Sequence, residues 1–253
     1  STVTGKDGMT LLYVPAGEFI MGSKAQDARA ACLEYHSFCS VGSFEDEEPQ
    51  HRVNLAAFWI DETEVTNAMY EQCVQDGACN VNVERSYTRD SYFGNPEFDN
   101  YPVVFVSWND AKTYCEWADR RLPTEAEWEK AARGENGFLY PWGNDPPNKH
   151  LINYNYFIAD TTQVGKYTNS VSPYGASDMA GNVWEWVSSI YKPYPYDPTD
   201  GREDSASQGD RVMRGGSWSN FQGGVVHTAY RHAFEATATY WDFGFRCAMD
   251  VTP

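Results

Sequence analysis

The chain has few positive charges and no long hydrophobic run. Its 19 lysines and arginines are outnumbered by 36 aspartates and glutamates, which gives a formal net charge of −17. Nucleic-acid binding is disfavoured, because nothing could neutralise a run of phosphates. No apolar segment reaches the roughly 20 residues that a membrane-spanning helix needs, and no signal peptide is visible. The acidity is explained either by colloidal solubility or by attraction of cations, which means calcium or a basic partner.

Several common catalytic signatures are also missing. The sequence contains no GxSxG elbow and no phosphate-binding loop. His227 and His232 lie close together in a predicted loop, but no third metal ligand is evident. Carboxylates are so numerous that no single acid–base pair stands out.

Cysteine is scarce but paired. Of six cysteines, Cys32 lies close to Cys39 and Cys73 close to Cys79, and neither pair has the CxxC spacing of a zinc site. The spacing favours local disulfides, each contributing about 2–4 kcal/mol. Disulfides indicate an oxidising compartment, extracytoplasmic or at the cell surface. The alternative is a cytosolic protein with six free thiols.

The composition predicts one loop-rich domain over residues 1–253. The chain contains 20 glycines, 13 prolines and 15% aromatic residues, but no flexible linker and no internal repeat. Its length is sufficient for a substantial core, and we expect a monomer.

Local patterns predict strands at the N-terminal end. Residues 9–23 read as two strands around a turn at residues 15–17, and residues 53–60 read as another strand. The polar stretch 81–100 is predicted to be a structured surface loop. Beyond Tyr140 we expect short strands and long loops, including a strand at residues 184–187 and an excursion at 191–210.

Three helices have clear start signals. Thr66 is a good cap for a helix from residue 67 to about residue 75, and Ser107 caps a second helix with Asp110 at its third position. Thr124 and Glu127 form a capping box for the third helix. Its predicted buried stripe and its terminating glycine are Trp128, Ala131, Ala132 and Gly134.

Eight segments together resemble one known family. In chain order they are VPAGEF with MG (14–22), EVTN (64–67), PV with VSW (102–108), RLPTEAEWE (121–129), YPWGN (140–144), MAGNVWEW (179–186), RGGSW (214–218) and GFRCA (244–248). Their order and spacing resemble the sulfatase-modifying, formylglycine-generating enzyme family over about residues 7–250. The resemblance implies an α+β fold, a variant of the C-type lectin fold. Such a fold is low in regular structure, with short helices around small twisted antiparallel sheets.

The family resemblance also implies a disulfide and two calcium sites. Members join the positions of Cys115 and Cys247 by a disulfide. The ligands carried over for calcium are Asp178, Met179, Gly181, Val183 and Glu185 at one site, and Asn153, Tyr154 and Asp160 at the other. Calcium takes six to eight oxygens, many of them loop carbonyls. The alternative for Glu185 is a buried carboxylate hydrogen-bonded to loop amides.

The catalytic thiols of the active family members are absent. In those enzymes two cysteines between the RGGSW and GFRC signatures bind copper and oxidise a substrate cysteine to formylglycine. Here the aligned positions fall at about Asn220 and Gly223, which cannot form thiolates or ligate copper. We therefore expect no copper and no oxidase activity. A second branch makes sulfoxides with iron held by histidines of an additional helical domain, which this sequence lacks.

A binding module is the favoured hypothesis. Rings interleaved with small polar residues predict a recognition surface for a peptide, protein or glycan, at Ser219, Asn220, Phe221, Tyr230, His232, Phe234, Tyr240, Trp241 and Asp242. The alternative is that half of these rings fill the core. Arg231 and Arg246 are expected to support loops rather than to touch a ligand.

Two more specific hypotheses concern the same interval. The resembling fold includes proteins diversified by retroelement mutagenesis between these two signatures, and accessory modules beside bacterial kinases. The enzymatic alternative is a formylglycine-generating-type oxidoreductase or an enzyme of unrecognised chemistry. The latter predicts convergent polar groups with shifted pKa values in a pocket near Trp184, Ser217 and Asn220.

Overall fold

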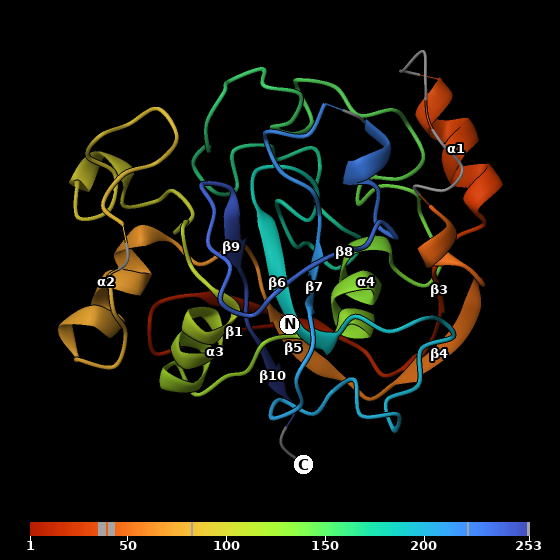
Figure 1. Cartoon of the computed structure of the whole chain (residues 1–253), viewed down its shortest axis with the longest axis horizontal. Helices are drawn as coiled ribbons and strands as arrows, with labels where there is room; N and C mark the ends of the chain where they lie inside the picture. Colours follow the sequence, from red (N-terminus) through yellow and green to blue (C-terminus); the bar gives the residue numbers. More distant parts are fainter. Residues whose placement is uncertain (35–38, 40–43, 82, 222, 252–253) are drawn as a thin grey trace.

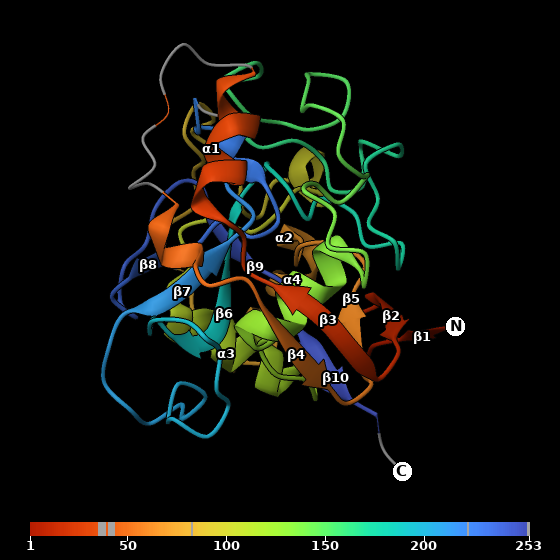
Figure 2. The ribbon, with the colours of Figure 1, turned by 90° about the vertical axis from the view of Figure 1, so that its right-hand side faces the viewer.

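The structure, a computed structural model, describes residues 1–34, 39, 44–81, 83–221 and 223–251. Regular structure is sparse and mixed, which confirms the α+β fold (Figures 1 and 2). The described helices are α1 (Ala25–Leu33), α2 (Asn67–Gln75), α3 (Trp108–Trp117) and α4 (Glu125–Arg133), with short 3₁₀ helices η2 (Glu45–Glu47), η3 (Pro96–Phe98) and η4 (Gly223–Val226). None of them is long and apolar enough to cross a membrane.

Three sheets organise the described residues. The first has the order β1-β2-β5-β10, from Thr2–Thr4, Thr10–Val14, Phe58–Asp61 and Ala248–Asp250. The second pairs β3 (Gly17–Met21) with β4 (His51–Leu55). The third has the order β8-β7-β6-β9, from His232–Phe234, Arg211–Arg214, Trp184–Ile190 and Phe243–Phe245. In this third sheet β9 runs parallel to β6, and the other two pairings are antiparallel.

The helices pack their apolar faces against the sheets. Trp128, Ala131 and Ala132 of α4 form one buried cluster with apolar side chains of β2, β5, β6 and β7. Figure 1 shows α3 and α4 flanking the sheet that contains β6. A larger cluster joins α2 and α3 to β6 and β9. The core therefore fixes β6 and β9 from several directions.

The three predicted helices are confirmed, because their start signals are local. Thr66 accepts a hydrogen bond from the Met69 backbone N–H, and both α3 and α4 begin with complete capping boxes. Gly134 ends α4 at a φ of +67°. The two strands predicted within residues 9–23 are also confirmed, as β2 and β3.

Two local predictions need correction. Residues 53–60 do not form one strand, because β4 ends at Leu55 and pairs with β3, whereas β5 begins at Phe58 and pairs with β2 and β10. Helix α1 was not predicted. Its N-cap residue, Lys24, makes no side-chain capping hydrogen bond, and its buried side chains are small.

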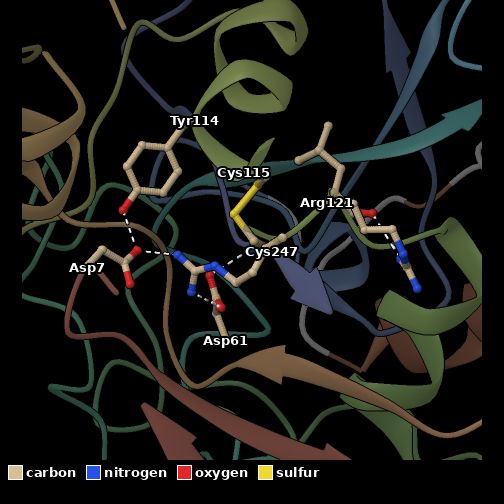
Figure 3. Close-up of a disulfide and its surroundings, with 8 residues drawn as sticks. Asp7, Asp61, Tyr114, Cys115, Arg121 and Cys247 are labelled. Atoms are coloured by element: carbon tan, nitrogen blue, oxygen red, sulfur yellow. Dashed lines mark hydrogen bonds and ion pairs between the residues drawn. A yellow bond between two sulfur atoms is a disulfide. The ribbon is translucent and has the colours of Figure 1, made fainter. Parts of the chain in front are cut away.

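All six cysteines form disulfides, which confirms the three predicted pairs. They are Cys32–Cys39, Cys73–Cys79 and Cys115–Cys247. The last one joins α3 to the segment before β10 across a sequence separation of 132. Figure 3 shows Asp7, Asp61 and Tyr114 beside this bridge. Disulfides of this number indicate an oxidising environment.

Candidate ligand-binding pocket

A pocket with aromatic walls opens beside β6, β8 and β9. Its volume is about 250 Å³, and its walls are the rings of Trp184, His232, Phe234, Tyr240 and Phe243. The rings contact one another, with centroids 5.4 Å apart for Trp184 and His232 and 4.9 Å apart for Tyr240 and Phe243. Trp184 and Phe243 are nearly buried, whereas Tyr240 is 41% exposed. Trp184 and Phe243 therefore form the buried base of the pocket, and Tyr240 forms its accessible rim.

The polar side of the pocket is made by Asp242 and Asn220. Asp242 Oδ2 accepts hydrogen bonds from the hydroxyls of Ser217 (2.7 Å) and Ser219 (2.8 Å). Asn220 Oδ1 accepts a hydrogen bond from the backbone N–H of Ser217, at 2.6 Å. Burial raises the pKa of the Asp242 carboxyl, while the two serine hydroxyls act to lower it. Asp242 is thus a desolvated carboxylate held in place by the RGGSW turn.

Glycines of both signatures allow the close packing around this pocket. Gly216 has a φ of +70°, and a Cβ there would lie 2.8 Å from Val226 Cγ1. A Cβ on Gly244 would lie 2.8 Å from Val183 Cγ2 and 3.0 Å from the Val103 carbonyl oxygen. A side chain at Gly216 would push the segment that carries Ser217 away from Val226. A side chain at Gly244 would push the segment that carries Asp242 away from Val183 and Val103.

The structure brings together most of the predicted recognition residues. Asn220, His232, Phe234, Tyr240 and Asp242 line the pocket, and Ser219 supports it by its bond to Asp242. Two predicted residues lie elsewhere. Trp241 lines a separate hollow of about 160 Å³, and Phe221 is 65% exposed and stacks on Tyr156 at 4.6 Å.

Two of the wall residues were missed by the list of recognition residues. Trp184 and Phe243 face each other in the parallel pairing of β6 with β9, and the Trp184 backbone N–H donates to the Asp242 carbonyl. In the sequence, Trp184 begins the WEW motif and Phe243 directly precedes the GFRC motif. These residues join the site only through the pairing of strands that are far apart in the chain.

A second hollow adjoins the pocket at His232. Its volume is about 470 Å³, and its lining includes Asp46, Asp210, Tyr230 and Arg231. Tyr230, the remaining predicted recognition residue, lies here, and its ring is 6.0 Å from Trp184. The Arg231 guanidinium is already paired with Glu125. The side of this hollow that faces solvent is therefore acidic.

No thiol is available near the pocket. Asn220 turns its amide inward toward Ser217, and Gly223 begins η4. Helix α1 packs against η4, and a Cβ on Gly224 would lie 2.8 Å from Cys32 Cβ. Every cysteine is in a disulfide, so that none is present as a thiolate beside the pocket.

The first predicted calcium loop contains a carboxylate that already has a cation. Arg246 holds Glu185 through two hydrogen bonds of 2.7 Å, and the indole of Trp128 donates to the same carboxylate at 2.7 Å. Asp178 accepts a bond from the Gly165 backbone N–H, and burial raises its pKa to about 6. Each oxygen of Glu185 thus accepts a hydrogen bond from Arg246, and Oε2 accepts a second one from Trp128. The predicted carbonyl ligands, Met179, Gly181 and Val183, lie in the same loop.

The second predicted calcium loop offers one open oxygen. Asp160 accepts hydrogen bonds from Ser86 and Thr88, and its other oxygen lies 3.2 Å from Arg89 Nη1. The side-chain oxygen of Asn153, the residue before Tyr154, is buried and has no hydrogen-bond partner among the described residues. That orphaned acceptor fits a bound cation or water.

Glu64, which is not among the predicted site residues, is a further buried acceptor. Its Oε1 has no hydrogen-bond partner within the described part of the chain, and its Oε2 accepts from Asn182. Burial, together with nearby Asp178 and Glu185, raises the pKa of this carboxyl well above its ordinary value. Across residues that the structure describes, no three His, Cys, Asp or Glu side chains are grouped to hold a metal ion.

Buried arginines support the segments around the pocket, as expected for Arg231 and Arg246. Arg231 pairs with Glu125 and donates to the carbonyls of Asp46 and Lys192. Arg246 pairs with Glu185 and donates to the Ser177 carbonyl. Neither guanidinium is free to reach a ligand.

Comparison with known proteins agrees with this architecture. The sulfatase-modifying factor enzyme 1-like domain matches residues 2–251. The chain belongs to this family. It is 31% identical to the inactive C-alpha-formylglycine-generating enzyme 2 of Mus musculus, over 95% of this chain and 86% of that protein. It is 36% identical to the serine/threonine-protein kinase pkn1 of Chlamydia pneumoniae, over 84% of this chain and 36% of that protein. The chain thus spans little more than a third of the kinase's length.

Solved structures share the fold of this family member. PvdO from Pseudomonas aeruginosa has a TM-score of 0.77 and 25% identity, and the match covers 99% of this chain and 98% of that one. Variable protein 1 of Treponema denticola has a TM-score of 0.72 and 22% identity, over 98% of both chains. The second likeness concerns the fold alone.

Proposed function

We propose that this chain is a non-catalytic binding module of the sulfatase-modifying-factor fold. Its ligand, a peptide, protein or glycan, occupies the aromatic pocket between Trp184 and Tyr240. One observation carries the proposal. The interval between the two signatures supplies ring walls and a carboxylate, while all six cysteines are in disulfides. Such a surface gives contact area at low entropic cost but lacks the nucleophile of an oxidase.

The similarity to a relative named as inactive supports this proposal. A more specific form is a receptor diversified by retroelement mutagenesis, with variation confined to residues 219–242. Sequencing many copies of the encoding locus tests that form, because substitutions spread evenly along the chain would contradict it. The three disulfides support an extracytoplasmic or cell-surface location.

We also propose a structural calcium ion in each of the two predicted loops, one around Asp178 and the other around Asn153. The support is the buried, unpartnered Asn153 oxygen and the burial of Asp178. Each ion would fix its loop by taking the loop's oxygens as ligands. No part of ligand binding in the pocket depends on these ions.

One observation favours an enzyme as the second candidate. Asp242 has a raised pKa and lies beside two serine hydroxyls, which is the kind of polar convergence that an active site requires. Ser217, however, is fully buried and cannot meet a substrate. We expect no oxygen consumption with copper and a Cys-x-Pro-x-Arg peptide, and measurable turnover would refute the non-catalytic function.

Arrays of peptides and glycans test the binding function directly. We expect that ligands captured by the natural chain are lost with Tyr240→Ala, which removes a rim ring. The matched control is Tyr13→Ala, a tyrosine of β2 in another sheet that is 37% exposed, close to the 41% of Tyr240. Equal binding by both variants, or binding lost with Tyr13→Ala alone, would place the binding surface away from the pocket.

A further inference from the structure

Asp242 is a buried carboxylate that has no counter-ion within the described part of the chain. The residue is 6% exposed, and its Oδ2 accepts hydrogen bonds from the hydroxyls of Ser217 and Ser219. No lysine or arginine among the described residues forms an ion pair with it. By contrast, buried Glu125 pairs with Arg231 and buried Glu185 pairs with Arg246, each at 2.7 Å. A desolvated carboxylate of this kind is costly unless a cation joins it.

The walls around Asp242 have the chemistry to accept such a cation. Trp184, Phe234, Tyr240 and Phe243 line the same pocket, and the faces of these rings attract ammonium and guanidinium groups. His232 does not oppose the cation. Its Nδ1 accepts the Ala233 backbone N–H at 2.9 Å, and partial desolvation lowers the pKa of the imidazole, which keeps the ring neutral.

Other ligand classes fit less well. An anionic group would be repelled by the Asp242 carboxylate. A purely apolar group would fill the space between the rings but would leave that carboxylate desolvated and without a counter-ion. The adjoining hollow adds Asp46 and Asp210, so that a second positive charge next to the first one is also favoured. The net charge of −17 attracts such a ligand from a distance.

We propose that the pocket binds the cationic side chain, lysine or arginine, of a peptide or protein partner. The rings of Trp184 and Tyr240 flank the cationic head, and Asp242 is its counter-ion. The inference rests on the proposed binding function and specifies its ligand class.

Blocked tripeptides test the inference with defined probes. Glycine-lysine-glycine, glycine-arginine-glycine and glycine-norleucine-glycine are titrated into the protein, and the dissociation constants are measured by NMR shifts of the tryptophan indole N–H groups. We expect at least one of the two cationic probes to bind about tenfold more tightly than norleucine. The better of the two identifies the preferred head group.

Two variants separate charge from shape. Asp242→Asn should reduce the binding of the cationic probe to that of norleucine. Asp145→Asn is the control, because Asp145 is exposed and its backbone carbonyl, which the substitution leaves unchanged, accepts a hydrogen bond from Trp142. If Asp242→Asn lowers the melting temperature, Tyr240→Leu provides a second test. It keeps apolar volume at the rim but removes the aromatic ring, and it should weaken the binding of the cationic probe several-fold.

The outcomes distinguish this inference from the function on which it rests. Equal binding of norleucine and the cationic probes overturns the inference but leaves a binding pocket. Cationic binding that survives both Asp242→Asn and Tyr240→Leu overturns it as well. If no tripeptide and no array ligand perturbs the pocket, the proposed binding function itself fails.

Discussion

Replacing Arg120 by methionine should destabilise the fold far more than the same change at Arg121. The Arg120 side chain is 1% exposed, its Nη1 donates to Asp61 Oδ1 at 2.6 Å, and its Nη2 contacts Asp7. Both carboxylates are fully buried beside the Cys115–Cys247 bridge (Figure 3). Methionine preserves much of the side-chain volume but leaves two buried carboxylates without their cation. We expect a loss of about 3–5 kcal/mol in the free energy of unfolding.

The loss should grow with pH. Burial raises the pKa of Asp61 from 3.8 to about 7, although Arg120 and the Cys247 backbone N–H act to lower it. An acid whose pKa is raised by folding contributes stability that is complete below about pH 4 and disappears as the pH rises toward 7. Without Arg120 the pKa of Asp61 rises further. The variant should therefore lose least at pH 5 and most at pH 8.

Urea unfolding at pH 5 and pH 8 measures both effects, with Arg121→Met as the control. Arg121 is the next residue, but its side chain is 35% exposed, and one of its partners, Asp250, is 78% exposed. We expect the control to lose about 1 kcal/mol, with little dependence on pH. Equal losses for the two variants, or a loss at Arg120 that does not change between the two pH values, would refute the reasoning.

Two further predictions concern the covalent and ionic supports of the fold. Changing Cys115 and Cys247 together to alanine should lower the free energy of unfolding by about 5 kcal/mol, whereas the same change at Cys73 and Cys79 should lower it by about 2 kcal/mol. The difference arises because the disulfide that closes the longer loop restrains the unfolded chain more. Equal losses in chemical unfolding would contradict this. Chelation with EDTA should lower the melting temperature, and calcium at a hundredfold excess over its dissociation constant should restore about 2.7 kcal/mol. Asn153→Ala, which changes one of the two sites, should weaken that response, and an unchanged melting temperature in EDTA would count against a calcium site.

Local signals explain how much of the fold could be predicted. The capping residues Thr66, Ser107 and Thr124 act within one helical turn, so their helices begin where the sequence indicates. The cysteine pairs Cys32–Cys39 and Cys73–Cys79 are also local. The family motifs supplied what local patterns could not, namely the fold and the Cys115–Cys247 pairing.

Long-range pairing explains what was missed. Residues 53–60 read as a single strand, but its two halves belong to different sheets because their partners lie elsewhere in the chain. Phe243 becomes a pocket wall only when β9 pairs with β6, which places it opposite Trp184. The pairing of Glu185 with Arg246, which is far away in sequence, was not predicted either. No sequence pattern identifies Asp242 as a buried carboxylate that lacks a counter-ion among the described residues.

The distribution of buried charge separates the side chains that support the fold from those at the rim of the pocket. Arg231, within residues 219–242, pairs with Glu125 of α4, and Arg246, just after that interval, pairs with Glu185 of β6, so that carboxylates outside the interval hold it in place. Tyr240, at the rim, takes no part in these pairs. Tyr240→Ala should therefore change the free energy of unfolding by only about 1 kcal/mol while abolishing ligand binding, whereas Arg231→Met should cost about 3–5 kcal/mol. If unfolding measurements gave the two variants equal losses, the pocket wall would itself hold the fold together and could not vary independently of it.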